Sequence, residues 1–194
     1  MSVDIEKAAL RALLATRRQA AFTADPDAGL GLAAMFPDAL TPAPGCVVSG
    51  FLRFRSEIDP APLMARLAAA GCVLALPRTP GKSDAAGLVF HRWRLGDPLV
   101  RSAFGVMEPL QEADVLAPDL VLAPLLGFDR AGRRLGYGRG HYDRAVAALR
   151  AHKSVTVVGL AYAAQEVPVI VTDATDQRLD WIVTPTLALK VAGS

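Results

Sequence analysis

The segment 132–144 combines alternating glycines with a dense cluster of arginines. Gly136, Gly138 and Gly140 leave backbone N–H groups open to a bound oxyanion, because glycine has no side chain to block the approach. A helix expected directly after these glycines would add the positive end of its dipole. Residues 130–144 hold five arginines against one aspartate, a local charge of +4 in a chain whose net charge is +2. These features favour a phosphate-binding loop over an ordinary surface turn.

Asp143 lies at the start of that expected helix and can be interpreted in two ways. A carboxylate there can hold Mg²⁺, which proteins commonly bind through one or two carboxylates together with nucleotide phosphates. The same carboxylate can instead stabilise the helix by facing its positive dipole end. The residue taken alone leaves both interpretations open.

Two other glycine motifs are weaker candidates for nucleotide binding. Gly29-x-Gly31-x-x-Ala34 follows a loop rich in proline and aspartate, whereas a dinucleotide-binding motif follows a strand. Gly81-Lys82-Ser83 is similar to the end of a Walker A loop, but Leu76 stands where that motif requires its first glycine. The first is expected to bind no dinucleotide, and the second is expected to be an exposed connection.

The segment 132–144 also matches the pattern G-x-R-L-G-x-G-x-G-x-Y-D-R at every specified position. Through this match the chain resembles the 5-formyltetrahydrofolate cyclo-ligase family, also called 5,10-methenyltetrahydrofolate synthetase. Further landmarks of the family occur in its order along nearly the whole chain. They are K-x-x-L-R from Lys7, E-[VI]-D from Glu57, L-P-R from Leu76, G-[IV]-x-E-P from Gly105 and D-x-x-L-D…T from Asp176. Two positions depart from the family pattern, since Thr175 replaces a frequent histidine and His141 a common tyrosine.

The resemblance implies an enzyme that cyclises 5-formyltetrahydrofolate to 5,10-methenyltetrahydrofolate while ATP is converted to ADP and phosphate. A formamide carbonyl is a poor electrophile, so the γ-phosphoryl group is expected to activate the formyl oxygen. Phosphoryl transfer asks a protein mainly for positioning and charge neutralisation. ATP as co-substrate and Mg²⁺ are therefore the expected cofactors.

The resemblance also implies roles for individual residues. Catalysis is expected of Arg134, Arg139 and Tyr142, and magnesium binding of Asp143 and Asp176. Folate is expected at Glu57 and Glu108. The nucleotide is expected at Lys7, Arg11, Arg134, Leu135, Gly136, Tyr137, Gly138, Arg139, Gly140, His141 and Tyr142.

Two alternative functions remain compatible with the sequence. One is an ATP-dependent kinase or ligase that acts on another small acid and shares only the nucleotide loop. The other is a non-catalytic relative that binds a nucleotide or RNA.

The elements that must position these residues are those of an α/β fold. Apolar residues at helical spacing predict an amphipathic helix over 3–22, and a short helix is expected near 30–35. Strands at 46–54 and 72–76 flank a helix that begins at Asp59-Pro60, continues to Ala70 and is followed by Gly71. This βαβ unit predicts a parallel pair of strands. Further strands are predicted at 88–94, 104–107, 119–123, 155–160 and 181–184, with a helix at 141–151. The alternation predicts a three-layer αβα sandwich with a mainly parallel central sheet.

Composition sets the remaining expectations. At 194 residues, with 52% hydrophobic and 21% charged residues, the chain is expected to fold as a single domain over 1–194. A net charge of +2 is too small to drive nucleic-acid binding. Cys46 and Cys72 lie in apolar runs without metal-site spacing and are expected to be reduced core residues. Without a membrane-length apolar run, the sequence predicts a cytoplasmic protein that binds no membrane, and a monomer is expected.

Overall fold

The computed structural model describes residues 3–79 and 87–192. The Gly81-Lys82-Ser83 motif lies outside the described residues. Helices α1 (Val3–Ala24) and α2 (Ala28–Met35) confirm the two helices expected near the N-terminus. A 3₁₀ turn, η1 (Asp38–Leu40), then leads to the first strand.

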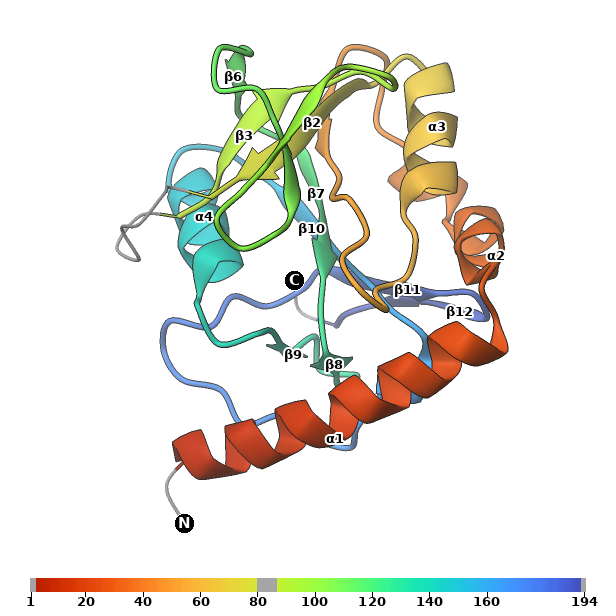
Figure 1. The fold of residues 1–194 in the computed structure, drawn as a ribbon, viewed down its shortest axis with the longest axis vertical. Helices are drawn as coiled ribbons and strands as arrows, with labels where there is room; N and C mark the ends of the chain where they lie inside the picture. The colour runs from red at the N-terminus through yellow and green to blue at the C-terminus, as the bar shows by residue number, and fades with distance from the viewer. Residues whose placement is uncertain (1–2, 80–86, 193–194) are drawn as a thin grey trace.

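A central sheet of eight strands runs through the molecule in the order β12-β11-β10-β7-β1-β2-β3-β6 (Figure 1). Its middle strands are parallel, namely β1 (Val47–Ser49), β2 (Val73–Arg78), β7 (Leu120–Pro124), β10 (Thr156–Leu160) and β11 (Trp181–Thr184). The edges are antiparallel and consist of β3 (Val89–Arg92), β6 (Val115–Leu116) and β12 (Leu187–Lys190). The predicted mainly parallel sheet is confirmed.

Helices cover both faces of this sheet and make the three predicted layers. On β7, Leu120 and Leu122 point to the core shared with α2 and α3 (Ala61–Ala69). Val121 and Ala123 point to the opposite core, against α4 (His141–Arg150). This alternation follows from the two-residue period of a strand and explains why a strand buried on both faces is apolar throughout. Figure 1 shows α2 and α3 on one side of the sheet and α4 on the other.

The βαβ unit forms as predicted, although its helix starts one residue later than expected, with Pro60 rather than Asp59 at the N-cap. Asp59 Oδ1 accepts a hydrogen bond from the Ala61 N–H at 3.0 Å, which satisfies a free donor at the start of α3. Gly71 ends the helix with φ at +88°, a left-handed conformation that favours glycine. The strands β1 and β2 on either side are parallel.

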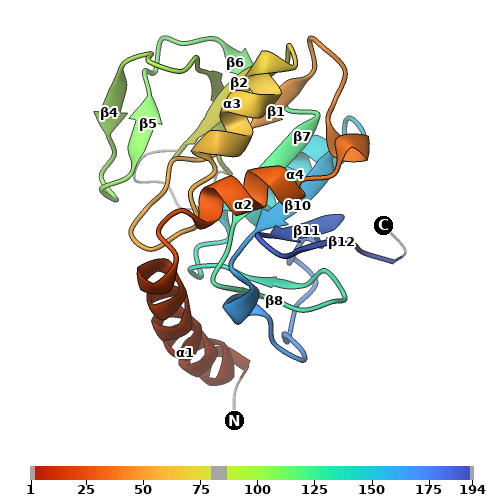
Figure 2. The same ribbon diagram turned by 90° about the vertical axis from the view of Figure 1, so that its right-hand side faces the viewer.

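Helix α1 lies apart from the three layers and packs across one end of the sheet (Figure 2). Leu14, which is fully buried, joins a small core with Leu126, Leu135, Val167 and Ile170. The helix also contacts the 3₁₀ turn η2 (Ala163–Gln165). Residues far apart in the sequence therefore meet beneath α1.

Two strand predictions were wrong in extent. The strand predicted over 46–54 ends at Ser49. Phe51 packs into the core from the loop that follows, so the apolar sequence pattern continues beyond the end of the strand. The strand predicted over 104–107 starts only at Met107, because Gly105 has φ at +79° within a turn. That turn joins β4 (Leu99–Arg101) to β5 (Met107–Pro109), and this hairpin was not predicted.

The remaining expectations concern short elements and cysteines. A small hairpin of β8 (Gly127–Phe128) and β9 (Arg134–Leu135) precedes α4 and was also not predicted. Cys46 and Cys72 are both free, as expected, but only Cys72 lies in the core, whereas Cys46 is partly buried. No helix in the described ranges combines the length and the apolar character needed to cross a membrane.

Candidate functional site

A cavity of about 620 Å³ opens where the parallel strands β1, β2 and β7 end. Ligands in open α/β sheets bind at this edge, outside the carboxyl ends of the strands. Its walls come from the first half of α1, the loop after β1, the ends of β2 and β7, the β4–β5 hairpin and the glycine loop before α4. All of the predicted site residues line it, namely Lys7, Arg11, Glu57, Glu108, the residues 134–143 and Asp176. Their roles remain predictions, but the fold brings every one of them together.

The glycine loop (residues 136–140) is shaped by left-handed backbone conformations. Gly138 has φ at +95° and Gly140 has φ at +62°, and Gly140 directly precedes α4. Side chains are strained in this region, so glycine is needed at both positions. Arg11 Nε donates a hydrogen bond to the Gly136 carbonyl at 3.0 Å, which ties the loop to α1.

The arginines of the glycine-rich segment differ in what they face. Arg130 pairs with Glu166 at 2.7 Å and Arg133 with Asp129 at 3.4 Å, so these two charges are compensated by neighbouring carboxylates, and neither arginine lines the cavity. Arg134, Arg139 and Arg144 line the cavity itself. The local charge of +4 counted from the sequence therefore overstates the positive charge that faces a ligand.

Arg134 is held rigidly at the base of the cavity. Its Nη2 donates to Asp143 Oδ1 at 2.7 Å, and its Nη1 donates to the Gln177 carbonyl at 3.2 Å. The Gln177 N–H donates to the same Asp143 oxygen at 2.9 Å. Asp143 thus orients a buried arginine as well as standing in the first turn of α4.

Lys7 lies between two carboxylates of the loop that precedes β11. Its Nζ is 3.1 Å from Asp173 Oδ2 and 3.0 Å from Asp176 Oδ2. Partial burial lowers the pKa of Lys7, but the hydrogen bonds to Asp176 and Asp173 outweigh it and raise the pKa overall. Hydrogen bonds from Thr175, helped by Lys7, lower the pKa of Asp173 to about 2. Lys7 and Asp173 therefore both stay ionised at neutral pH.

The carboxylates here fit a magnesium ion only in company with phosphate oxygens. Within residues 3–79 and 87–192, no three His, Cys, Asp or Glu side chains gather closely enough to hold a metal by themselves. Mg²⁺ usually takes one or two carboxylates and fills its shell with phosphate and water. Asp143 and Asp176 line the same cavity, and Asp143 Oδ2 accepts no hydrogen bond from the part of the chain that is described.

Glu57 follows β1 and is buried at the cavity wall, with 5% of its surface exposed. Tyr137 Oη donates to Glu57 Oε1 at 2.8 Å, and the Phe54 N–H donates to Oε2 at 3.0 Å. The Arg18 guanidinium lies 3.8 Å from Oε1. Burial raises the pKa of Glu57 despite the Tyr137 and Phe54 hydrogen bonds and the Arg18 charge, which lower it.

Two other predicted residues have clear local surroundings. Glu108 Oε1 accepts hydrogen bonds from the Thr79 N–H at 3.0 Å and the Thr79 hydroxyl at 2.8 Å, so it holds the end of β2. Burial raises the pKa of the Tyr142 hydroxyl, and the nearby charge of Glu57 raises it further. Tyr142 therefore keeps its proton at neutral pH.

Sequence reasoning missed two residues that organise the site. Arg18 is 3% exposed and reaches Ser56, Glu57 and Tyr137 from α1. Its spacing from Lys7, Arg11 and Leu14 follows one helix face, which is a signal the sequence carries. Asp173 pairs with Lys7 and had no signal beyond its closeness in sequence to Asp176.

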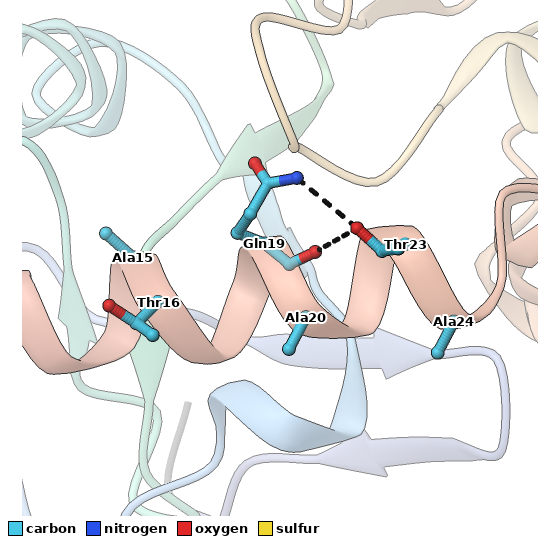
Figure 3. Close-up of a pocket in the computed structure, with 6 residues that line it drawn as sticks. All are labelled: Ala15, Thr16, Gln19, Ala20, Thr23 and Ala24. Carbon is cyan, nitrogen blue, oxygen red and sulfur yellow. Dashed lines mark hydrogen bonds between the residues drawn. The ribbon is translucent and has the colours of Figure 1, made fainter.

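The other candidate sites serve packing. An added Cβ would lie 2.5 Å from the Asp59 carbonyl at Gly29 and 3.2 Å from Pro185 at Gly31, so these glycines let α2 approach its neighbours. A shallow depression on the outer face of α1 is lined by small or uncharged side chains, as Figure 3 shows. In Figure 3 the Thr23 hydroxyl donates to the Gln19 carbonyl and accepts from the Gln19 amide. The depression offers no charged group for a phosphate.

Comparison with known proteins agrees with this geometry. The model of the 5-formyltetrahydrofolate cyclo-ligase family matches residues 4–185. The chain belongs to this family. The Escherichia coli K12 5-formyltetrahydrofolate cyclo-ligase is 35% identical over 142 residues, which cover 71% of this chain and 77% of the relative. The Haemophilus influenzae cyclo-ligase is 37% identical over 96 residues, about half of each chain.

The solved structures of the family confirm the fold. The chain aligns with Aquifex aeolicus 5,10-methenyltetrahydrofolate synthetase at a TM-score of 0.75 and 24% identity, covering 97% of this chain and 94% of the other. For the Mycoplasma pneumoniae synthetase the TM-score is 0.70 at 23% identity, with 92% and 98% covered. Family membership makes the chain an enzyme and implies ATP as co-substrate and a small folate as substrate.

Proposed function

We propose that the chain cyclises 5-formyltetrahydrofolate to 5,10-methenyltetrahydrofolate with conversion of ATP to ADP and phosphate. The observation that carries the proposal is that a glycine-rich cationic loop and a buried carboxylate, Glu57, line the same cavity. The loop supplies N–H groups and arginines for phosphates, and Glu57 supplies an acceptor for the amino-pyrimidine part of the pterin. The two reactants would thus be held next to each other, which is the main requirement for phosphoryl transfer.

The proposed sequence of steps balances without further reactants. The formyl oxygen attacks the γ-phosphorus and ADP leaves. The formyl group thereby becomes an imino-phosphate, whose carbon is activated for attack. N10 then attacks this carbon, the bond from the carbon to the phosphorylated oxygen breaks, and the leaving phosphate takes that oxygen and the proton that N10 loses. Arg134 and Arg139 stabilise the charge on the transferred group, while Tyr142, which stays protonated, donates a hydrogen bond.

Nucleotide binding is assigned to α1 and the glycine loop together. Lys7 and Arg11 reach the cavity from one face of α1, and the residues 134–142 surround the phosphates. Asp143 and Asp176 would hold Mg²⁺, which when bound neutralises phosphate charge. Glu108 is assigned to the folate side, where it also fixes Thr79. Contacts between α1 and the loop before β11 support a single domain over 1–194.

The proposal is tested by incubating the purified protein with MgATP and 5-formyltetrahydrofolate and following the near-ultraviolet absorbance of the methenyl product. Product formation that requires both reactants supports the proposal. ATP turnover only with a different small acid would indicate another kinase or ligase. Nucleotide or RNA binding without any turnover would indicate a non-catalytic relative.

A further inference from the structure

A chain of buried polar groups connects the glycine loop to Glu57. Tyr137 Oη donates to Glu57 Oε1 at 2.8 Å and accepts from Arg18 Nη1 at 2.5 Å. The Arg18 Nε donates to the Ser56 hydroxyl at 3.3 Å, so Arg18 is fixed on two sides. Glu57, Arg18 and Ser56 are each no more than 5% exposed, which makes these hydrogen bonds stronger than they would be in water.

Tyr137 differs from its partners because it belongs to the glycine loop. Its side chain is 46% exposed at the cavity surface, although its hydroxyl reaches the buried Glu57. Before it, the Gly136 carbonyl accepts a hydrogen bond from Arg11; after it, the Arg11 guanidinium lies against Gly138, 3.2 Å from where a Cβ would stand. The backbone on both sides of Tyr137 is therefore in contact with α1.

Tyr137 also stands at an unspecified position of the loop pattern, the x between Gly136 and Gly138. The phosphate-binding role assigned to the loop uses its backbone and its arginines, and needs no phenol at that position. Packing explains the phenol poorly, because the ring is half exposed while the hydroxyl makes two hydrogen bonds. The hydroxyl is therefore explained by its bonds to Glu57 and Arg18, and of these two residues only Glu57 lines the cavity.

We propose that Tyr137 is a positioning residue that couples nucleotide binding to folate binding through its hydrogen bond to Glu57. This inference rests on the proposed function, since it takes phosphates at the loop and folate at Glu57. A nucleotide that orders the loop also orders Tyr137, and with it the carboxylate that receives the folate. The coupling is reciprocal, so folate strengthens nucleotide binding by the same factor.

The test is calorimetric titration with 5-formyltetrahydrofolate, with and without a saturating non-hydrolysable ATP analogue and magnesium. In the wild type the analogue should tighten folate binding by about fivefold or more, the lower end of typical coupling between sites. In Tyr137→Phe the ring remains and only the hydroxyl is lost, so the protein should fold normally. The factor by which the analogue tightens folate binding should then fall towards one. A merely structural role would not change this factor.

Tyr162→Phe is the matched control, because it removes the same atom from a tyrosine that is 5% exposed in the core beside α2 and α3. It should keep the wild-type factor. A wild-type factor of one, or an unchanged factor in Tyr137→Phe, overturns the coupling while leaving the proposed function standing. A wild type that binds no folate under either condition overturns both.

Discussion

Asp143 binds Arg134 and the Gln177 N–H through one carboxylate oxygen, and this makes its two interpretations separable. Asn keeps an acceptor at that position but loses the charge. If Asp143 also holds Mg²⁺, Asp143→Asn should reduce turnover by about 10²–10³, the usual effect of removing one electrostatic contact to a transition state. Excess magnesium should restore part of this loss. The measurement is turnover against magnesium concentration for both proteins.

A loss in Asp143→Asn that stays the same at every magnesium concentration would contradict the metal role. It would assign Asp143 to the orientation of Arg134 alone. Melting temperatures of the two proteins, taken alongside, separate either effect from a loss of folded protein.

Because Glu57 is a buried carboxyl group, we expect folate binding to depend on pH. Burial raises its pKa, and the groups that face it are Arg18, Tyr137 and Tyr142. The amino-pyrimidine needs the ionised carboxylate, so folate affinity should fall as pH decreases through the raised pKa. The fall is at most about tenfold per pH unit, the limit for one proton.

Glu57→Gln should weaken folate binding and flatten this profile, because an amide does not titrate. Folate titrations that start near the ordinary glutamate pKa of about 4.3 and continue upwards in pH follow this change of charge. If Glu57→Gln keeps the wild-type profile, a group other than Glu57 must titrate.

At the scale of elements, the glycine loop depends on the left-handed conformation of Gly138. Valine there is strained by about 1–3 kcal/mol and meets the Arg11 guanidinium, so Gly138→Val should displace the loop. Misplacing a reacting group by about 1 Å costs about 10²-fold in rate, and kcat/KM should fall by at least that much. Steady-state kinetics and thermal melting check this together.

Gly96→Val is the control for backbone strain. Gly96 has φ at +96° in the turn before β4, and an added Cβ there meets no atom of the described chain within 4 Å. Both variants should lose similar stability, but Gly96→Val should keep its activity. Equal losses of activity in the two would mean that strain alone, rather than the loop's place in the cavity, explains the effect.

Helix α1 is predicted to bind the nucleotide through Lys7. Removing a hydrogen bond to a charged group costs about 1.5–3 kcal/mol, so Lys7→Ala should weaken nucleotide binding about tenfold or more while folate binding changes little. Arg17→Ala removes an exposed charge from the same helix and should change neither. Calorimetric titration with each ligand measures both effects, and a loss of folate affinity equal to that for nucleotide would refute the division of roles.

Local signals explain which elements were predictable from the sequence. The βαβ unit was predicted because Asp59, Pro60 and Gly71 act on their nearest neighbours in the chain. The glycine loop was predicted because its residues are consecutive. The β4–β5 hairpin was missed, since the turn at Gly105 falls within an apolar stretch that was interpreted as a strand.

At the scale of the whole molecule, the contacts that complete the site join distant parts of the chain. Arg18 meets Glu57 and Tyr137 only after α1 has packed across the end of the sheet, and Lys7 meets Asp176 across 169 positions. Composition and periodicity give the three layers, but they do not give the strand order or these pairings. The family pattern marked about half of the residues that line the cavity, whereas Asp173 and Arg18, which contacts Glu57 without lining the cavity, needed the fold.

The central claim is that ATP activates the formyl oxygen inside this cavity. It is tested most directly by supplying 5-formyltetrahydrofolate with ¹⁸O in the formyl group, together with MgATP, and analysing the phosphate and methenyl product. We expect equal amounts of phosphate and methenyltetrahydrofolate, with the label in the phosphate. Unlabelled phosphate, or phosphate released without methenyltetrahydrofolate, would contradict the claim.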